Sequence, residues 1–216
     1  MKKVKTGDGS YTFMNPEFEE VYHSVSGAEE EAVRKYAEPT KVAEIAKQNG
    51  EVRILDVCFG IGYNSAAAID AVLKANPDCK IKIVGLEKDD TLPEKLSDLE
   101  PGFSNYHIIK KIEDGNYRSD NVDITILYGD AAEKIEEVKG EFDVCFLDPF
   151  SPRKLPHLWT EGFFKDIASK LKKNALLATF SCATHVRINL VRAGFEVEDG
   201  PCVGRRAPST VATKIV

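Results

Sequence analysis

The sequence of 216 residues predicts a single α/β domain with a mainly parallel, seven-stranded sheet flanked by helices. Two observations carry this prediction. Short apolar runs rich in Val, Ile and Leu alternate with helical stretches, which is typical of parallel strands joined by crossover helices. Several of these runs end in an acidic residue or a glycine turn. Open α/β sheets bind ligands at the carboxyl ends of their strands, so these ends predict one binding edge.

The residues before the sheet are expected to form a capping segment, residues 1–50. Residues 7–15 are rich in turn formers and predict a hairpin. Residues 27–48 predict a helix that is interrupted at Pro39, because proline disrupts the preceding helical turn. Such a segment can lie over the carboxyl ends of the strands in residues 51–216.

The first half of the sheet is expected from three apolar runs with helical stretches between them. In order, we expect a strand at 52–57, a helix at 63–75, strands at 81–87 and 124–128, and a helix at 131–137. Asp130 directly precedes the last of these helices and can cap its first turn.

The second half continues the alternation and closes with two late strands. In order, we expect a strand at 142–147, a helix at 159–171, a strand at 175–180, a helix at 184–192, and strands at 195–197 and 210–215. Thr160 or a neighbour is the candidate N-cap of the first helix. Gly194 is expected just after the second, where a left-handed residue ends many helices.

Composition limits the class of protein. No apolar run approaches the about 20 residues that span a bilayer, and no apolar stretch follows the basic N-terminus as in a signal peptide. We therefore expect a cytoplasmic protein without membrane contact. The 5 cysteines are scattered with no CxxC pair, so we expect neither a disulfide framework nor a metal site.

Charge is distributed unevenly along the chain. Residues 148–216 carry 11 Lys and Arg against 6 Asp and Glu, whereas residues 1–147 carry 18 against 29. The basic second half can hold a polyanion on one face, or these charges can simply solvate the surface.

The turn from Asp56 to Ser65 is a candidate ligand loop. Gly60 and Gly62 allow the backbone to turn tightly and approach a ligand closely. Ser65 stands where a dinucleotide-binding loop has its third glycine, and Asp56 would repel a diphosphate, so a nicotinamide-dependent oxidoreductase is disfavoured. A carboxylate here instead attracts a ligand with an ammonium and a sulfonium group, and we predict S-adenosylmethionine.

Two further acidic strand ends are candidate cofactor contacts. Glu87 ends the second strand, where a carboxylate can accept hydrogen bonds from both ribose hydroxyls. Asp130, after the third strand, is placed to accept from the amino group of adenine. A helix N-cap is the alternative role for each.

Asp148-Pro149-Phe150 ends the fourth strand, over the predicted position of the transferred methyl group. An amine must be neutral to attack a methyl group, and a carboxylate within reach can orient the amine and take its proton. Phe150 can support a flat base by stacking. The alternative is that Asp148 only caps the next turn.

The segment 147–164 resembles the central motif of the MnmC-like tRNA methyltransferases, Leu-Asp-(Gly/Ala)-Phe-(Ala/Ser)-Pro-x-Lys-x-Pro-x-x-Trp. Residues 6–12, 22–30 and 177–195 also resemble this family. The resemblance implies a Rossmann-like class I S-adenosylmethionine-dependent methyltransferase fold. It also implies methylation of the 5-aminomethyl group of the tRNA wobble uridine, which is often 2-thiolated.

The resemblance also implies roles for individual residues. Asp148 matches the aspartate that is taken as the base preparing the amine. Matches to cofactor-binding positions are Gly60, Gly62, Glu87 and Asp130 in the sheet-bearing domain, with Tyr22, Ser24 and Glu30 in the segment over the cofactor. We expect a stand-alone methyltransferase domain without the flavin domain of the bifunctional enzymes, which accepts the aminomethyl form and not the carboxymethyl form.

Three places depart from the family pattern. Cys58 stands in the glycine loop where Gly is usual, and Pro149 replaces Gly or Ala. The tail at residues 204–209 also differs. Of these, Pro149 and the tail bear on the identity of the acceptor more than on the chemistry.

Acceptor binding is expected to involve basic and aromatic residues near the motif. Phosphate contacts are expected from Arg153, Lys154, Arg205 and Arg206, with Lys165 and Arg187 as further candidates. Trp159 is a candidate to flank a flipped base, and packing at the start of its helix is the alternative.

Other functions remain open at this stage. The same chemistry on another amine, or aminopropyl transfer from decarboxylated cofactor, are the enzymatic alternatives. Aminopropyl transfer needs an acidic polyamine channel, which the basic second half argues against. A tRNA- or cofactor-binding module without catalysis is the alternative from a different class.

Overall fold

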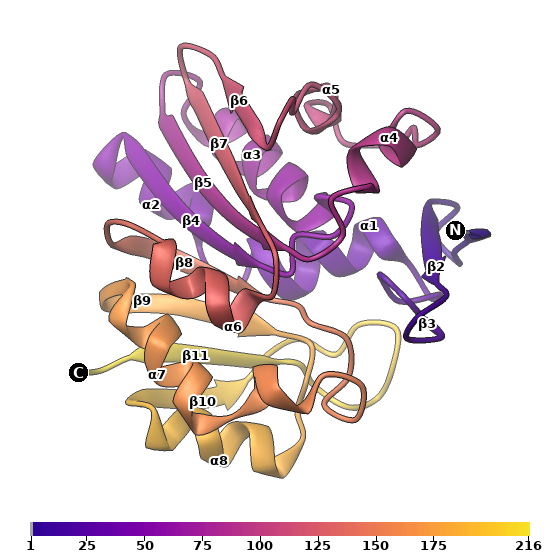
Figure 1. The fold of residues 1–216 in the computed structure, drawn as a ribbon. Helices are drawn as coiled ribbons and strands as arrows, with labels where there is room; N and C mark the ends of the chain where they lie inside the picture. Colours follow the sequence, from indigo (N-terminus) through magenta and orange to yellow (C-terminus); the bar gives the residue numbers. More distant parts are fainter. Residues whose placement is uncertain (1) are drawn as a thin grey trace.

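The computed structural model describes residues 2–216 and contains a central sheet that is covered by helices on both faces (Figure 1). Its strands are β4 (Glu51–Val57), β5 (Lys80–Glu87), β6 (Asn116–Arg118), β7 (Val122–Tyr128), β8 (Phe142–Leu147), β9 (Leu171–Thr179), β10 (Phe195–Asp199) and β11 (Thr210–Lys214). They lie in the order β10-β11-β9-β8-β4-β5-β7-β6.

The five inner strands, from β7 to β9, are parallel, whereas β11 and β10 on one side and β6 on the other pair antiparallel. The chain runs outward from β4 through β5 to β7 and then returns to β8. Strand order therefore reverses between β4 and β8, and this reversal opens a crevice at the carboxyl ends of the strands.

The prediction of a mainly parallel α/β sheet is confirmed, but the predicted number of strands was too low. The sheet has eight strands, because β6 adds a short antiparallel edge beside β7. β6 contains only three residues, Asn-Tyr-Arg, so it has no apolar run from which a strand could be predicted.

Helices cover the two faces of the sheet and bury two separate apolar clusters. One face is covered by α1 (Ala28–Glu31), the π-helical turn η1 (Ala32–Ala37), α2 (Val42–Asn49), α3 (Tyr63–Ala75), α4 (Leu92–Leu96) and α5 (Tyr106–Lys110). The other is covered by α6 (Ala131–Lys134), η2 (Ile135–Glu137), η3 (Pro156–Trp159), α7 (Glu161–Ser169) and α8 (Thr184–Arg192). Ile54 and Leu55 illustrate the strand alternation, because these neighbours enter opposite clusters.

Helix ends follow the sequence closely. The Thr160 hydroxyl caps α7 by accepting from the Phe163 amide at 3.2 Å, and Gly194 follows α8 with φ +94°. The helix expected over 159–171 is shorter than predicted, because Trp159 ends η3 and Leu171 begins β9. The elements α4 and α5 were not predicted, since each has only five residues.

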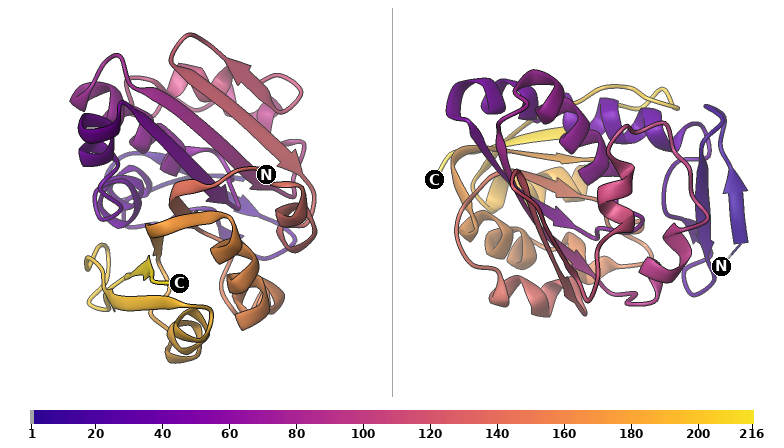
Figure 2. Two further views of the ribbon diagram at one scale, coloured as in Figure 1. Left: turned by 90° about the vertical axis from the view of Figure 1, so that its left-hand side faces the viewer. Right: turned by 90° about the horizontal axis from the view of Figure 1, so that it is seen from above.

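The N-terminal residues form a second, three-stranded antiparallel sheet of β1 (Lys2–Lys5), β2 (Tyr11–Asn15) and β3 (Glu20–Val21). It stands apart from the central sheet, beyond the carboxyl ends of the parallel strands (Figure 2). The predicted hairpin is confirmed, and the predicted break at Pro39 falls in the turn between η1 and α2. Within residues 2–216, no helix combines the length and the apolar character required to cross a membrane.

Candidate active site

A cavity of about 990 Å³ opens at the crevice between the sheet and the N-terminal residues. Its floor is formed by the residues after β4, β5 and β8, and its roof by residues 14–25. We call residues 11–25, which contain β2 and β3, the cover. The volume is at the upper end of the range for cavities that enclose small-molecule ligands.

The loop after β4 forms part of the floor. Gly60 has φ +56°, and a Cβ added there would lie 3.2 Å from the Tyr22 ring. Gly62 has φ +74° but does not line the cavity, because its added Cβ would meet Ile109 and Phe59 in the core. Gly60 therefore admits a ligand next to the backbone, whereas Gly62 permits the turn and its packing.

Glu87 ties this loop to the end of β5. Its Oε2 accepts from the Gly60 amide at 2.7 Å and its Oε1 from the Asp89 amide at 2.8 Å. The side chain is largely buried and lines the cavity, and burial raises its pKa above the ordinary value. A carboxylate has about four acceptor positions, so two remain for hydroxyl groups of a ligand.

Asp56, which we expected to contact the cofactor, lies beneath the loop and does not line the cavity. It is fully buried, its Oδ2 accepts from the Ser65 hydroxyl at 2.6 Å, and its Oδ1 has no partner among the described residues. Burial raises the pKa of Asp56 to about 8. The expectation of direct contact is corrected, because alternation along β4 turns this side chain toward α3.

Asp148 directly follows β8 and lines the cavity. The Tyr36 hydroxyl donates to its Oδ1 at 2.5 Å, and Asn64 Nδ2 donates to its Oδ2 at 2.9 Å. Burial, followed by the nearby Glu31 carboxylate, raises the pKa of Asp148 to about 7. The carboxylate is therefore held in one orientation and exchanges its proton near neutral pH.

Tyr36 and Asn64 were not predicted from the sequence. Asn64 follows the glycine loop by two residues, and its polar side chain at the start of α3 was a signal that could have been used. Tyr36 gives no such signal, since its contact with Asp148 joins residues 112 positions apart.

In α1, Glu31 lines the cavity, whereas Glu30, the predicted site residue, does not. Glu30 is about half exposed and pairs with Arg34 at 2.8 Å. Glu31 is buried, accepts from the Ser24 amide at 2.6 Å, and pairs with Lys35 at 2.5 Å. Consecutive side chains in a helix point about 100° apart. Because both positions are acidic, the sequence does not show which of the two faces inward.

The cover is joined to the loop after β8 by two kinds of contact. The Phe150 ring lies 4.8 Å from the Phe18 ring and 5.2 Å from that of Tyr22, between centroids. Glu20 accepts from the amide of Ser151 at 3.0 Å and from its hydroxyl at 2.5 Å. Tyr22, Ser24 and Phe150, all predicted site residues, line the cavity.

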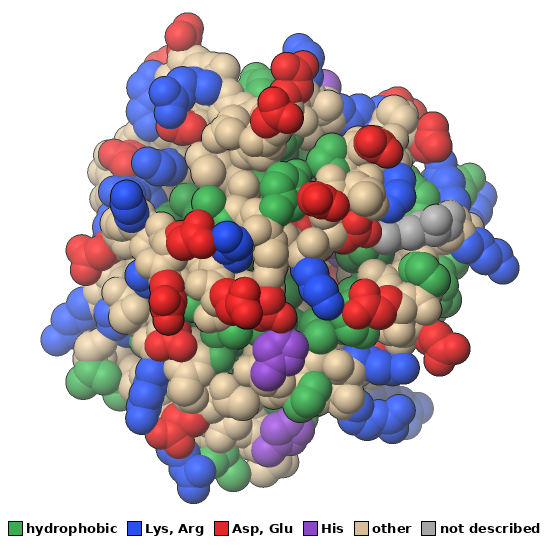
Figure 3. Space-filling model, viewed as in Figure 1, with side chains coloured by type: hydrophobic (Ala, Val, Ile, Leu, Met, Phe, Trp, Pro, Cys, Tyr) green, Lys and Arg blue, Asp and Glu red, His purple; other side chains and the backbone are tan. Residues whose placement is uncertain are grey.

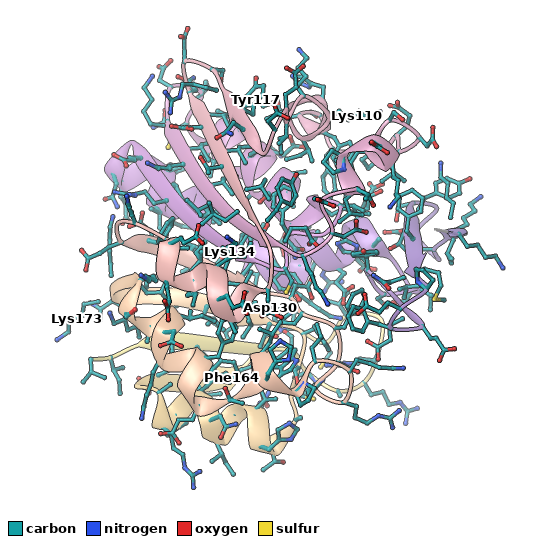
Figure 4. The ribbon with its side chains drawn as sticks, in the orientation of Figure 1. Lys110, Tyr117, Asp130, Lys134, Phe164 and Lys173 are labelled. Carbon is teal, nitrogen blue, oxygen red and sulfur yellow. The ribbon has the colours of Figure 1, made fainter. Side chains whose placement is uncertain are left out.

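Asp130 lies at the start of α6 (Figure 4) and lines the cavity. Its Oδ1 accepts from the Ala132 amide at 2.9 Å, so the N-cap alternative is confirmed. Its Oδ2 lies 3.1 Å from His157 Nε2. A contact with adenine stays a prediction and would have to share these oxygens.

The predicted acceptor residues lie in different places. Arg205 lines the cavity, where it donates to the carbonyl oxygens of Phe180 and Pro208. Arg153 and Arg206 are exposed and do not line it, and Lys154 lies 4.0 Å from Glu19. Basic and acidic side chains are interspersed over the face in Figure 3.

Trp159 packs in the core and does not flank the cavity. It is 2% exposed, and its Nε1 donates to the Phe150 carbonyl at 3.0 Å. The packing alternative therefore holds, and the prediction of a contact with a flipped base is corrected. Trp159 instead holds the backbone of Phe150, the residue that we expected to stack on a base, through this hydrogen bond.

Comparisons with known proteins point to one family. Residues 99–215 match the model of a family described as S-adenosyl-L-methionine-dependent methyltransferase. The crystal structure of MnmC2 from Aquifex aeolicus superposes with a TM-score of 0.89 at 32% identity, covering 98% of this chain and 69% of that one.

Two curated relatives are longer than this chain. An uncharacterized protein of Methanocaldococcus jannaschii is 33% identical over 98% of this chain and 59% of its own length. The tRNA 5-methylaminomethyl-2-thiouridine biosynthesis bifunctional protein MnmC of Pseudomonas putida is 28% identical over 88% of this chain and 32% of its own. The chain thus spans about three fifths of the first relative and about a third of the second.

Proposed function

Since the chain belongs to the family of S-adenosyl-L-methionine-dependent methyltransferases, as its resemblance to the MnmC-like enzymes predicted, we propose that it methylates an amine. The proposed acceptor is the 5-aminomethyl side chain of the wobble uridine in tRNA. The names of the relatives support this acceptor. The observation that carries the chemistry is Asp148, held by two donors at the cavity floor.

The residues around the cavity fit the cofactor. Glu87 offers free acceptor positions beside the Gly60 backbone, which suits a ribose with two vicinal hydroxyls. Among the described residues, the lining contains nine acidic and four basic side chains. This excess of negative charge suits a ligand with a sulfonium cation.

When bound, S-adenosylmethionine supplies an electrophilic methyl group. The protein must then present a neutral amine to that group. Asp148 accepts a hydrogen bond from the acceptor ammonium, orients it, and takes its proton at a carboxylate oxygen. Tyr36 and Asn64 keep the carboxylate in place, and a pKa of about 7 suits a base that works near neutral pH.

The rest of the acceptor would meet the aromatic side of the cavity. Phe18 and Phe150 form an apolar wall on which a base can stack. Arg205, Lys154 and the other basic residues of the second half are the proposed contacts with phosphates. We expect such an enzyme to act in the cytoplasm, where tRNA is modified.

The test is a methyl-transfer assay with labelled S-adenosylmethionine and three tRNA substrates. These carry 5-aminomethyluridine, carboxymethylaminomethyluridine or unmodified uridine at the wobble position. We expect label only in the first. Label in none of them, with normal cofactor binding, would show that the acceptor is a different amine.

The acidic lining also favours a second candidate function, transfer to a polyamine. We expected the basic second half of the chain to argue against an acidic channel, but the cavity lining contains Glu17, Asp89 and Asp90. A cationic polyamine would also suit this lining. The same assay with free polyamines, and with decarboxylated cofactor as aminopropyl donor, separates the two functions.

A further inference from the structure

Lys35 is a buried lysine in the wall of the cavity with unused hydrogen-bond donors. Its side chain is 3% exposed and lines the cavity beside Asp148 and Glu31. One of its three N–H groups donates to Glu31 Oε1 at 2.5 Å. Within residues 2–216, no second acceptor lies within hydrogen-bond distance of the ammonium. Burial of an incompletely bonded ammonium is costly, so a ligand acceptor is expected there.

The neighbouring pair on the same helix shows that helix stability does not require this burial. Glu30 and Arg34 have the same spacing and pair at 2.8 Å, but they are about half exposed. An exposed pair gives a helix its modest stabilisation without the desolvation that Glu31 and Lys35 undergo. Helix stability therefore does not account for the burial of Glu31 and Lys35, and we attribute it to their position in the cavity wall.

The position of the pair matches one end of the cofactor. Glu87 ends β5, Asp148 directly follows β8, and β4 lies between these strands. η1, which carries Lys35, packs against α3 and against β9, and β9 lies on the side of β8 away from β5. From the ribose acceptor Glu87, the cavity thus leads past Asp148 to Lys35. A cofactor with its ribose at Glu87 and its sulfonium near Asp148 would bring its amino-acid end to this pair.

We propose that Lys35 and Glu31 bind the zwitterionic amino-acid end of S-adenosylmethionine, with Lys35 Nζ donating to its carboxylate and Glu31 accepting from its ammonium. A cation and an anion side by side complement a group that carries one of each. This inference rests on the proposed methyl transfer, because the decarboxylated cofactor of aminopropyl transfer lacks the carboxylate that Lys35 would bind.

The test compares ligands with and without the amino-acid end. Calorimetry would give the Kd of S-adenosylmethionine, decarboxylated S-adenosylmethionine and methylthioadenosine for the wild type, Lys35→Met and the control Arg34→Met. We expect Lys35→Met to weaken S-adenosylmethionine about 10–100-fold, the scale of a charged hydrogen bond, and methylthioadenosine less than about twofold. The preference for the carboxylated cofactor should then disappear. Arg34→Met should leave every Kd unchanged.

Equal weakening of methylthioadenosine, or an unchanged Kd for S-adenosylmethionine, would overturn the proposal. If Lys35→Met fails to fold because Glu31 is left unpaired, Glu31→Gln combined with Lys35→Met removes both charges, and the same three ligands decide. These binding ratios are measured without acceptor. Loss of the preference for the carboxylated cofactor in Lys35→Met, together with absent tRNA methylation by the wild type, would reject the proposed acceptor while supporting the role of Lys35.

Discussion

The carboxyl ends of the central strands and the cover enclose one cavity. These two regions are held in place by different kinds of contact. Glu87 ends β5 and Asp148 directly follows β8, and the backbones of both strands are paired on both sides within the sheet. The cover touches the loop after β8 through side chains, chiefly Glu20 with Ser151 and Phe18 with Phe150. Groups that must be placed accurately for chemistry therefore lie on the better-fixed region.

The difference suggests a division of work. Rigid strand ends suit the cofactor and the base. The tip of the cover, residues 16–20, meets the loop after β8 through a few side-chain contacts and can separate from it to admit a large acceptor, whereas Phe13 anchors the rest of the cover in the core. Changes in the strand ends should thus alter cofactor binding and turnover, and changes in the cover should alter acceptor binding.

The largest effect is expected for Asp148→Asn. Loss of a general base lowers turnover by about 10²–10⁴-fold, so we expect kcat for tRNA methylation to fall on this scale. The variant should still fold. Asn64 Oδ1 has no hydrogen-bond partner within residues 2–216, so rotation of the Asn64 amide lets this oxygen accept from the amide nitrogen of the new side chain. The Kd of S-adenosylhomocysteine, which has no sulfonium charge, is the control and should stay within about threefold. Unchanged turnover would contradict the role of Asp148.

A smaller effect is expected for Glu87→Gln at the other strand end. The charge that strengthens the proposed hydrogen bonds to ribose is lost, and the amide nitrogen of Gln cannot accept from one of the two backbone amides, Gly60 or Asp89. The Kd of S-adenosylmethionine should therefore rise about 10–100-fold. Asp90→Asn is the matched control, because it removes one negative charge from the cavity lining at an exposed position. Equal losses in both variants would mean that net charge, and not a specific contact, governs binding.

The same two regions explain what the sequence could predict. Asp56, Glu87, Asp130 and Asp148 were expected at one edge, and parallel topology does bring all four strand ends there. Three of them line the cavity. Asp56 does not, because alternation along β4 turns its side chain toward α3, where it accepts from the Ser65 hydroxyl.

Residues outside the strands were harder to predict. Glu31 was missed in favour of Glu30, since a helix with acids at consecutive positions has no sequence marker for its inner face. Tyr36 contacts Asp148 only when η1 packs over the sheet, and the Lys35–Glu31 pair, which is local to the helix, enters the cavity wall through the same packing. Trp159 was assigned to the acceptor, although a single large aromatic side chain in a helical pattern most often belongs to the core.

The protonation of Asp148 predicts a pH effect of intermediate size. A cationic ligand binds better to the ionised carboxylate, so affinity for S-adenosylmethionine should rise with pH through about 7. The ionised fraction of such a group rises from about a tenth to nine tenths between pH 6 and 8, which limits the gain to about tenfold. Calorimetry across this range measures the gain.

Two controls assign the pH effect to Asp148. S-adenosylhomocysteine should show a much weaker dependence, because it lacks the sulfonium cation. Asp56, with a pKa of about 8, titrates in the same range, so Asp148→Asn is needed to separate the two groups. A full rise that persists in Asp148→Asn would assign the effect to Asp56.

The smallest effect is expected in the cover. Glu20→Ala removes both hydrogen bonds to Ser151, which join the cover to the loop that carries Asp148 and Phe150. We expect KM for tRNA to rise about 3–10-fold, because these partly buried bonds to a charged group contribute modestly, while the Kd of the cofactor changes less than about twofold. Glu19→Ala is the control, since Glu19 is exposed and lies 4.0 Å from its partner Lys154. If Glu20→Ala instead weakened the cofactor as much as the acceptor, the cover would belong to the cofactor site. The division between fixed strand ends and a separable cover would then be wrong.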